Sequence, residues 1–347
     1  MSEETNCRSD LSQVSRQRVL IAGGAGFLGS HLSEKFINLG AEVICLDNLS
    51  TGRRENISEI MDNPRFTFIE ADVTSGKVLE IDGRLDAVFH LASPASPIDY
   101  QNIPIETLLA GSVGTRNLLE VATEKDSRFV LASTSEVYGE PLEHPQRETY
   151  FGNVDSTGPR SSYDEAKRYA EALTTAYRQD RGTDTAIVRI FNTYGPRMRE
   201  NDGRVVPAFI GQAIRGVPLT VAGDGEQTRA FCYVDDLIEG IVALASSSEY
   251  AGPVNLGNPQ EMTMLELAHL VIDVTGSASG IDFIPRPEGD PSRRKPDISL
   301  AARELNWSPQ VSPGTGLKQT ASWFARNLSE PRTRYTVVGD TRSRAKL

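Results

Sequence analysis

Cysteine is scarce in this chain of 347 residues, which has three, and neither a long apolar run nor a basic run occurs. Cys7, Cys45 and Cys232 show no spacing typical of a metal site or a disulfide framework, so we expect no metal and a reducing, cytoplasmic location. No apolar run approaches the ~20 residues of a membrane-spanning helix, and residues 1–16 lack the apolar core of a signal peptide. These absences predict a cytoplasmic protein that has no membrane among its partners.

Positive charge is also in deficit. The 36 Lys and Arg residues stand against 47 Asp and Glu residues, which gives a net charge of −11 and disfavours nucleic acid as a partner. Hydrophobic residues make up 39% and charged residues 24% of the chain, proportions typical of a soluble globular enzyme. The length allows one large domain or two modest ones.

Strand and helix patterns alternate along the first half of the chain. Short apolar runs with the length of buried strands are RVLIAGG (18–24), EVICLDN (42–48), LDAVFHLAS (85–93), RFVLASTS (128–135) and TAIVRIFN (185–192). Helix-length segments separate them, such as 29–40 and 163–182. This alternation predicts an α/β fold with a Rossmann-like, doubly wound parallel sheet. After about residue 195 the elements become shorter and mixed, which indicates a smaller C-terminal α/β region.

Three glycines lie between the first predicted strand and the helix that follows it. Gly23, Gly26 and Gly29 are spaced G-x-x-G-x-x-G. Glycines at such a turn let backbone N–H groups approach a pyrophosphate at the helix N-terminus, as in dinucleotide-binding sites. A glycine-rich turn alone is a weak signal, but Asp47 strengthens it. Asp47 ends the second predicted strand, where a carboxylate can bind the ribose of an adenine dinucleotide.

Asp47 also bears on which dinucleotide binds. A carboxylate at this place repels a 2′-phosphate, so the sequence favours NAD over NADP, although Arg53 and Arg54 nearby leave NADP open. Asp72 and Val73, in the segment EADV, fit the adenine side of the same site.

A tyrosine and a lysine provide the candidate chemistry. Tyr163 and Lys167 lie four residues apart in SSYDEAKRYAE, a spacing that places both on one face of a helix. An ammonium group beside a phenol stabilises the phenolate and lowers the pKa of the tyrosine, which makes Tyr163 a candidate base near neutral pH. Thr134, Ser135 and Glu136 follow the fourth predicted strand. They are candidates for the same site, because ligands bind at the carboxyl ends of parallel strands.

Longer segments resemble one enzyme family. The chain is similar to the extended short-chain dehydrogenases/reductases, and within them to UDP-glucuronate decarboxylases (UDP-xylose synthases), in the glycine turn and in HLASPAS, LASTSEVYGEPLEHPQRETYFGNV, YDEAKR and RIFNTYGPRM. The similarity continues to about residue 325 through NDGRVVPAFIGQAIRGVPLTVAGDGEQTRAFCYVDD, PVNLGNP and RRKPDISLAARELNWSP. It therefore spans nearly the whole chain, and these segments are far more specific than the glycine turn.

The resemblance implies NAD as the cofactor and a nucleotide sugar, UDP-glucuronate, as the substrate. Residues implied to hold NAD are Gly23, Gly26, Phe27, Leu28, Gly29, Asp47, Asn48, Asp72, Val73, Leu91, Ser93, Tyr163 and Lys167. Residues implied in catalysis are Thr134, Glu136, Tyr163, Lys167 and Arg294. Residues implied to bind the substrate are Ser135, Asn192, Arg204, Gln227, Arg229 and Arg294. The resemblance also implies a homodimer formed through a helix bundle, with the helix of Tyr163 as a candidate for the interface.

The implied reaction follows from the chemistry of the sugar. Glucuronate has its carboxylate on C5, so oxidation of C4 produces a β-keto acid, which loses carbon dioxide because the electrons delocalise into an enolate. Return of the hydride to C4 leaves a pentose and regenerates NAD within each turnover. Tyr163 would take the proton of the 4-hydroxyl, Lys167 would tune Tyr163 and bind the nicotinamide ribose, and Thr134 would hydrogen-bond the 4-oxygen. Glu136 would lie near the ring carbon that loses the carboxylate.

Two positions depart from the family pattern. Glu106 stands where these enzymes usually have Lys, and Gly111 stands where extended members usually have Asn. An anion would be unfavourable if it touched the pyrophosphate, so either Glu106 points away or the substrate differs from the family norm. Gly111 is expected to loosen its helix, at a cost of ~1 kcal/mol relative to Ala.

Three other functions stay open from the sequence. A UDP-glucuronate 4-epimerase would use the same tyrosine, lysine and NAD but would rotate the keto sugar; Glu136 and the RRKPD segment favour the decarboxylase. A nucleotide-sugar 4,6-dehydratase would have an Asp-Glu pair where this chain has Ser135 and Glu136. A non-catalytic NAD-binding regulator is disfavoured by the presence of both Tyr163 and Lys167.

On this interpretation the chain has two main parts and two tails. We expect residues 17–195 to be mainly an NAD-binding Rossmann domain and residues 196–328 mainly a nucleotide-sugar-binding region, with some chain crossing between the two. Residues 1–16 and 329–347 are expected to be flexible tails.

Overall fold

The structure is a computed structural model of the chain, and it describes residues 17–201, 203–247, 250–286 and 293–329. Residues 1–16 and 330–347, where tails are predicted, lie outside the described residues. The last described helix, α11, ends at Ser329, where the second tail was expected to begin. Of the helices in the described ranges, none combines the length and the apolar character needed to cross a membrane.

A parallel sheet forms the centre of the fold. Its strands follow the order β11-β6-β5-β4-β1-β2-β3, and every neighbouring pair is parallel. The strands are β1 (Arg18–Ala22), β2 (Glu42–Asp47), β3 (Phe66–Glu70), β4 (Ala87–His90), β5 (Arg128–Thr134), β6 (Thr185–Ile190) and β11 (Val254–Leu256). This order confirms the predicted Rossmann-like, doubly wound sheet. Sequence analysis missed β3, a half-exposed edge strand, and β11, which has only 3 residues.

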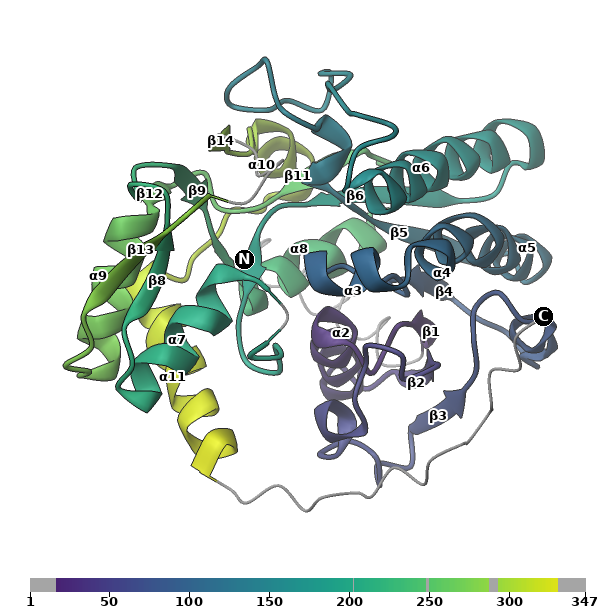
Figure 1. Ribbon diagram of the computed structural model, residues 1–347. Coiled ribbons are helices and arrows are strands. Elements are labelled where there is room, and N and C mark those ends of the chain that lie inside the picture. The colour runs from purple at the N-terminus through teal and green to yellow at the C-terminus, as the bar shows by residue number, and fades with distance from the viewer. Residues whose placement is uncertain (1–16, 202, 248–249, 287–292, 330–347) are drawn as a thin grey trace, which may run out of the picture.

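Helices cover both faces of this sheet (Figure 1). Alternate strand residues point to opposite sides: Val19 of β1 shares one buried core with Leu32, whereas Leu20 shares a second core with Leu118. The helices of the first face are α2 (Phe27–Asn38) and α8 (Val234–Ser246), and those of the second are α5 (Thr115–Glu124) and α6 (Ser161–Arg181). Because both faces are buried, the strands read as continuous apolar runs in the sequence.

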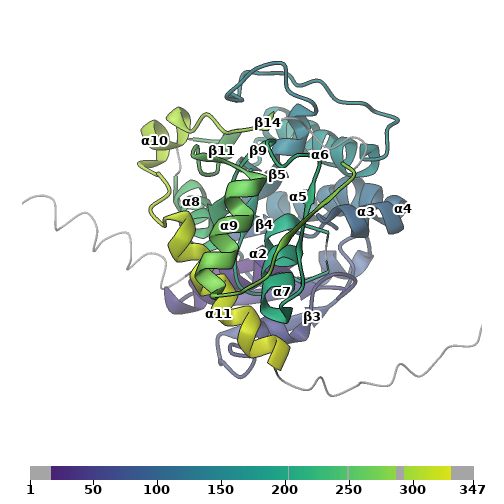
Figure 2. The same ribbon diagram turned by 60° about the vertical axis from the view of Figure 1, so that its left-hand side comes forward.

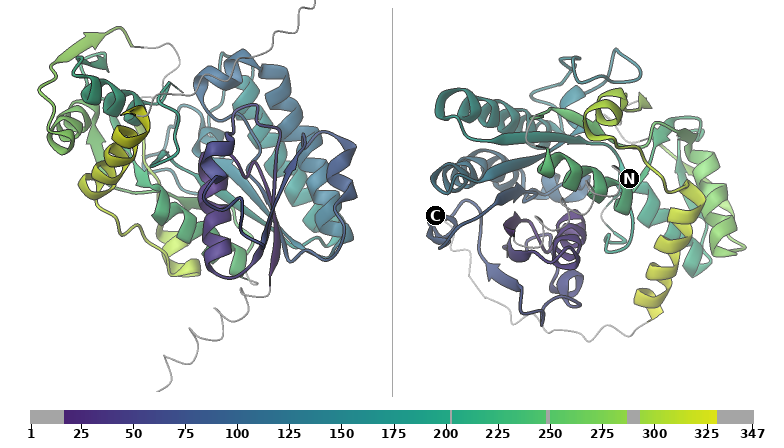
Figure 3. Two further views of the ribbon diagram at one scale, coloured as in Figure 1. Left: turned by 90° about the horizontal axis from the view of Figure 1, so that it is seen from below. Right: turned by 180° about the vertical axis from the view of Figure 1, so that it is seen from behind.

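A smaller lobe lies beside the sheet, and most of it is drawn in green and yellow in Figures 1 and 2. Figure 3 shows the two parts side by side from below and from behind. The lobe contains α7 (Val205–Arg215), α9 (Met264–Thr275), α11 (Pro313–Ser329), the pair β8 (Leu219–Ala222) and β13 (Ile281–Ile284), and the sheet of β9 (Thr228–Ala230), β12 (Glu261–Thr263) and β14 (Arg293–Arg294). The chain also returns to the central sheet through α8 and β11, and the division into two parts near residue 195 stays a prediction.

Short elements connect these parts. They are α3 (Pro97–Asn102), α4 (Pro104–Leu109), α10 (Ser299–Leu305), β7 (Thr193–Tyr194), β10 (Cys232–Tyr233), the 3-10 helices η1 (Arg54–Ile57), η2 (Gly76–Glu80) and η4 (Ser135–Tyr138), and the π-helical turn η3 (Ala110–Gly114). Gly111 lies in η3, which joins α4 to α5. A Cβ atom at Gly111 would lie 2.7 Å from the Cβ atom of Ala166 on α6, so glycine permits the close approach of η3 to α6. The helix type changes locally to a π-turn at this point, a feature often found beside functional sites, and the expected loosening stays a prediction.

Candidate active site

A cavity of about 730 Å³ lies at the carboxyl ends of the sheet strands and extends to the smaller lobe. Every residue that sequence analysis assigned to the cofactor, to catalysis or to the substrate lines it. The cofactor side has Gly23, Gly26, Phe27, Leu28, Gly29, Asp47, Asn48, Asp72, Val73, Leu91 and Ser93; the centre has Thr134, Ser135, Glu136, Tyr163 and Lys167; the lobe side has Asn192, Arg204, Gln227, Arg229 and Arg294. Within the described ranges, no group of three or more His, Cys, Asp and Glu residues could hold a metal ion.

The glycine turn forms one wall of the cavity between β1 and α2. Gly23 has a φ of +80°, and a Cβ atom there would lie 2.6 Å from the backbone nitrogen of Ala92. A Cβ atom at Gly29 would overlap the carbonyl oxygen of Gly23. Both positions therefore require glycine. The first turn of α2 consequently presents its backbone N–H groups at the wall, and this cradle fits the pyrophosphate of a dinucleotide.

Asp47 has a structural role in addition to the predicted one. It is 7% exposed, and its carboxylate accepts hydrogen bonds from the backbone N–H groups of Ala25 (3.0 Å) and Leu49 (2.8 Å). Burial raises the pKa of Asp47, while these hydrogen bonds act in the opposite direction. The carboxylate thus ties the end of β2 to the glycine turn. Next to it, Asn48 donates to Asp72 (2.7 Å), and Asp72 and Val73, the predicted adenine-side pair, both line the same wall.

The pKa of Tyr163 differs from the value that its spacing to Lys167 predicts. Burial raises the pKa of Tyr163 well above its usual range, and a hydrogen bond with Thr134 offsets this only in part. Lys167 donates to the carbonyl oxygen of Ala132 (2.7 Å), and its Nζ atom lies 5.9 Å from the centre of the Tyr163 ring. The prediction of a lowered pKa for Tyr163 is therefore wrong in this structure. The spacing places Lys167 near Tyr163, but loss of solvent outweighs what the ammonium group can contribute.

Glu136 lies between two arginines at the centre of the cavity. Its Oε1 atom is 2.5 Å from Nη1 of Arg294, and its Oε2 atom is 2.5 Å from Nη2 of Arg160. Burial alone would raise the pKa of Glu136, but the charges of Arg294 and Arg160 overcome burial and lower this pKa to about 2. The carboxylate is therefore ionised throughout the neutral range and holds both guanidinium groups in place.

Sequence analysis missed Arg160, which lines the cavity immediately before α6. Its guanidinium lies 5.9 Å from the centre of the Tyr100 ring, and Tyr100 stacks on Tyr163 with ring centres 5.2 Å apart. The position three residues before Tyr163 was an available signal, because it lies one helical turn from the candidate base. Arg197 and Arg199 also line the cavity, and no spacing in the sequence pointed to them.

Arg294 is buried although its segment is hydrophilic. It is 3% exposed, whereas Arg293 beside it is exposed. Pairing of β14 with β9 places Arg294 opposite Arg229, so two arginines enter the cavity wall from adjacent strands. Arg294 donates to the hydroxyl of Ser135 (3.2 Å) and to the carbonyl oxygen of Gly139 (3.1 Å). Arg294 thus joins the lobe to the centre of the site.

Glu106 lines the cavity from α4 and is exposed to solvent. An exposed carboxylate keeps its hydration, and salt screens its repulsion of a neighbouring anion. The position of Glu106 at the solvent boundary is therefore compatible with an anionic ligand.

This combination of fold and site defines a class of enzyme. A dinucleotide cradle and a tyrosine–lysine pair at one cavity of a doubly wound sheet are the features of a short-chain dehydrogenase/reductase. The sequence profile of the NAD dependent epimerase/dehydratase family matches residues 19–257. The chain belongs to this family, and membership confirms the prediction of NAD as the cofactor.

Individual relatives have narrower names. UDP-glucuronic acid decarboxylase 1 of Arabidopsis thaliana is 51% identical over 313 residues, which cover 90% of this chain and 71% of the relative. The protein of the same name from Danio rerio is 48% identical over 318 residues, which cover 92% of this chain and 75% of the relative. The solved structure of UDP-glucuronic acid 4-epimerase from Bacillus cereus, in complex with UDP-glucuronic acid and NAD, is 29% identical with a TM-score of 0.81 and covers 90% of this chain and 100% of that chain. The decarboxylase relatives confirm the resemblance stated from the sequence.

Proposed function

We propose that this protein is a UDP-glucuronate decarboxylase, which converts UDP-glucuronate to UDP-xylose and carbon dioxide. The observation that supports it best is the Arg160–Glu136–Arg294 cluster beside Tyr163. The two steps of the reaction take place at adjacent carbons of one sugar. Oxidation at C4 needs a base, and loss of the carboxylate from C5 needs a group that stabilises negative charge, so both groups must lie close together. The relatives named UDP-glucuronic acid decarboxylase, at 51% and 48% identity, support the same activity.

The oxidation depends on three residues in this proposal. NAD, when bound, would accept hydride from C4 and later donate it back to the same carbon. Tyr163 accepts the proton of the 4-hydroxyl as the phenolate, a form that the Lys167 ammonium group and the positive nicotinamide of bound NAD would favour against burial. Thr134, which hydrogen-bonds Tyr163, orients the 4-oxygen. Lys167 binds the nicotinamide ribose. The glycine turn and Asp47 hold the rest of the cofactor.

Decarboxylation depends on the cluster around Glu136. The C4 ketone makes the sugar a β-keto acid, so the bond between C5 and the carboxylate carbon breaks, carbon dioxide leaves, and the electron pair moves to the 4-oxygen as an enolate. Arg294 stabilises the negative charge that develops in this step. A proton from solvent then adds to C5, hydride returns to C4, and Tyr163 gives its proton back to the 4-oxygen, which leaves the pentose and restores the base. Residues proposed to hold the nucleotide sugar are Ser135, Asn192, Arg204, Gln227, Arg229 and Arg294.

The three alternatives have less support. The 4-epimerase of known structure is 29% identical to this chain, whereas the decarboxylase relatives share about half of its residues. A 4,6-dehydratase would have an acidic residue in place of Ser135, whose hydroxyl here accepts a hydrogen bond from Arg294. A non-catalytic regulator would have no need for Tyr163 and Lys167 at the cavity wall.

Incubation of the purified enzyme with UDP-glucuronate tests this proposal. We expect NMR to show UDP-xylose and an equimolar amount of carbon dioxide. NAD should co-purify, and no stoichiometric NADH absorbance should develop, because hydride leaves and returns at the same carbon. UDP-galacturonate as the product would identify an epimerase instead, and NADH release that matches product formation would contradict internal regeneration.

Asp47→Ala should narrow the preference of the enzyme for NAD over NADP. A carboxylate within a few ångströms of a 2′-phosphate costs roughly 1–4 kcal/mol, so wild type should bind NADP about tenfold more weakly or worse. Isothermal calorimetry with both cofactors measures the ratio of Kd values. Because Asp47 also accepts backbone hydrogen bonds, Asp47→Asn serves as a companion that removes the charge and keeps an acceptor. Equal affinity of wild type for NAD and NADP would refute this assignment.

We also propose a homodimer formed through α4 and α6, two helices that contact each other. Exposed apolar side chains lie on them: Ile105 (67%), Leu108 (41%) and Leu109 (43%) on α4, and Tyr169 (51%) on α6. A second copy of the chain would remove this surface from water. Light scattering should give the mass of a dimer, and a monomer at micromolar concentration would overturn the proposal.

The two free, buried cysteines of the described chain support our proposal of a cytoplasmic location.

A further inference from the structure

The side of α6 that has Tyr163 and Lys167 has a third titratable residue, Glu171, which the proposed mechanism does not use. Glu171 follows Lys167 by four residues and Tyr163 by eight, so the three side chains project from one side of the helix. The side chain of Glu171 is 13% exposed. Its Oε1 atom accepts a hydrogen bond from Ser133 on β5 (2.5 Å), and Ser133 stands between the two β5 residues that contact Lys167 and Tyr163.

Arg189 on β6 holds the carboxylate of Glu171 in a two-pronged ion pair. Its Nε atom donates to Oε1 (2.9 Å), and its Nη2 atom donates to Oε2 (2.7 Å). Ser133 and Arg189 are opposite each other in the parallel pairing of β5 with β6, so they reach Glu171 from adjacent strands. A contact of this kind defines orientation as well as distance. Glu171 therefore anchors α6 to both strands at once.

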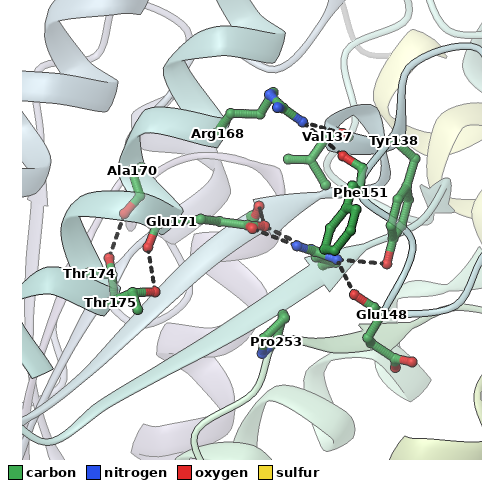
Figure 4. A network of polar contacts seen from close by, with 12 residues as sticks. Val137, Tyr138, Glu148, Phe151, Arg168, Ala170, Glu171, Thr174, Thr175 and Pro253 are labelled. Carbon is green, nitrogen blue, oxygen red and sulfur yellow. Dashed lines mark hydrogen bonds and ion pairs between the residues drawn. The ribbon is translucent and has the colours of Figure 1, made fainter. Parts of the chain in front are cut away.

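The opposite side of the Arg189 guanidinium is also occupied. Its Nη1 atom donates to the hydroxyl of Tyr138 (3.0 Å) and to the carbonyl oxygen of Glu148 (3.1 Å). Tyr138 in turn donates to Asn255 on β11 (2.8 Å). In Figure 4, Glu171 and Tyr138 face the same central group from two sides, and dashed lines mark the contacts. Glu171 is thus held by a partner that is itself immobilised.

We propose that Glu171 is a positioning residue for the reaction: held by Arg189 and Ser133, it sets the place of Lys167 and Tyr163 at the end of β5 and puts a negative charge one turn from the Lys167 ammonium. This inference rests on the proposed function, because it assumes that Lys167 acts in its protonated form.

The surroundings of Lys167 explain why a nearby carboxylate matters. Burial lowers the pKa of Lys167 to about 8, and Glu171 is the one charged group among the described residues that clearly raises it. Other titratable or charged groups around this part of α6 are His90 on β4, whose pKa burial lowers to about 3, Tyr163 on α6, whose pKa burial raises, and Arg189 on β6. Glu136 on η4 is also negative near neutral pH, but its charge acts on Tyr163 and Asp164 and is paired with Arg294 and Arg160.

Glu171→Gln separates the charge of Glu171 from its shape. We expect the titration midpoint of Lys167 to fall by about half a pH unit or more. The midpoint is measured by ¹³C NMR of protein labelled at lysine Cε, with the Lys167 resonance assigned by its loss in Lys167→Arg. The alkaline limb of the kcat profile should move in the same direction, while KM for UDP-glucuronate stays within about twofold. Asp180→Asn makes the same change at an 82% exposed side chain of α6 and should move neither.

Arg189→Lys provides a second test should Glu171→Gln fail to fold. Lysine keeps the positive charge but cannot form the two-pronged contact, so kcat should fall about tenfold while the alkaline limb stays in place. An unchanged Lys167 midpoint in Glu171→Gln, or wild-type kcat in Arg189→Lys, would overturn the inference. The NMR titration needs no substrate. If the wild-type enzyme did not convert UDP-glucuronate, the proposed function would be refuted. The NMR titration would still test whether Glu171 raises the pKa of Lys167.

Discussion

We expect Tyr163→Phe to lower kcat for UDP-glucuronate by about three orders of magnitude and to leave NAD bound. The substitution removes only the phenolic oxygen, the proposed acceptor of the 4-hydroxyl proton, and loss of such a group costs about 10²–10⁴-fold. Phenylalanine keeps the stacking on Tyr100, whose ring plane is inclined by only 10° to that of Tyr163. Because oxidation of C4 comes first, neither the 4-keto sugar nor carbon dioxide should form.

Carbon dioxide release and NMR of the sugar measure this loss. Tyr177→Phe is the matched control, because it removes a hydroxyl from the same helix about 21 Å away from Tyr163. The hydroxyl of Tyr177 hydrogen-bonds Glu120 and takes no part in the site. It should keep wild-type kcat. Unchanged Tm and NAD content in Tyr163→Phe would show that the chemistry, not the fold, is affected. Near-normal turnover by Tyr163→Phe would mean that another group is the base.

Arg294→Ala should lower kcat by about two orders of magnitude or more, with a smaller change in KM. A donor that stabilises charge in the transition state has an effect of this size on kcat, whereas one that only binds the ground state raises KM. Arg294 is 3% exposed and lies 2.5 Å from Glu136, and of the two arginines it lowers the pKa of Glu136 more. Its loss therefore also removes the stronger of the two interactions that keep this pKa at about 2. Steady-state kinetics with UDP-glucuronate measure both parameters.

Arg293→Ala is the control for this prediction. Arg293 precedes Arg294 on β14 but is exposed, so its removal should leave kcat near the wild-type value. Arg294→Lys keeps the charge and loses the planar fork, and it should recover only part of the activity. If Arg293→Ala and Arg294→Ala had the same, nearly full activity, Arg294 would have no part in the reaction.

Contiguous patterns made part of this site predictable. The glycine turn joins β1 to α2 within a few residues, and Tyr163 and Lys167 share one helix, so both patterns report backbone geometry that neighbouring residues determine. The assignment of Asn192, Arg204, Gln227, Arg229 and Arg294 required long segments that resemble a family. No local pattern distinguishes a buried Arg294 from an exposed Arg293, because the difference arises from pairing of β14 with β9 across the lobe.

By itself, the sequence determined the alternation of strands and helices, the dinucleotide turn and the spacing of the candidate base and its lysine, because these depend on residues close together in the chain. Only the tertiary structure decided the placement of Arg160 against Glu136, the second role of Asp47 and the anchoring of α6 by Glu171 and Arg189. It also reversed the expected direction of the pKa of Tyr163. The reason is physical: desolvation and ion pairing depend on which distant groups exclude water from one another, and that arrangement exists only once the chain has folded.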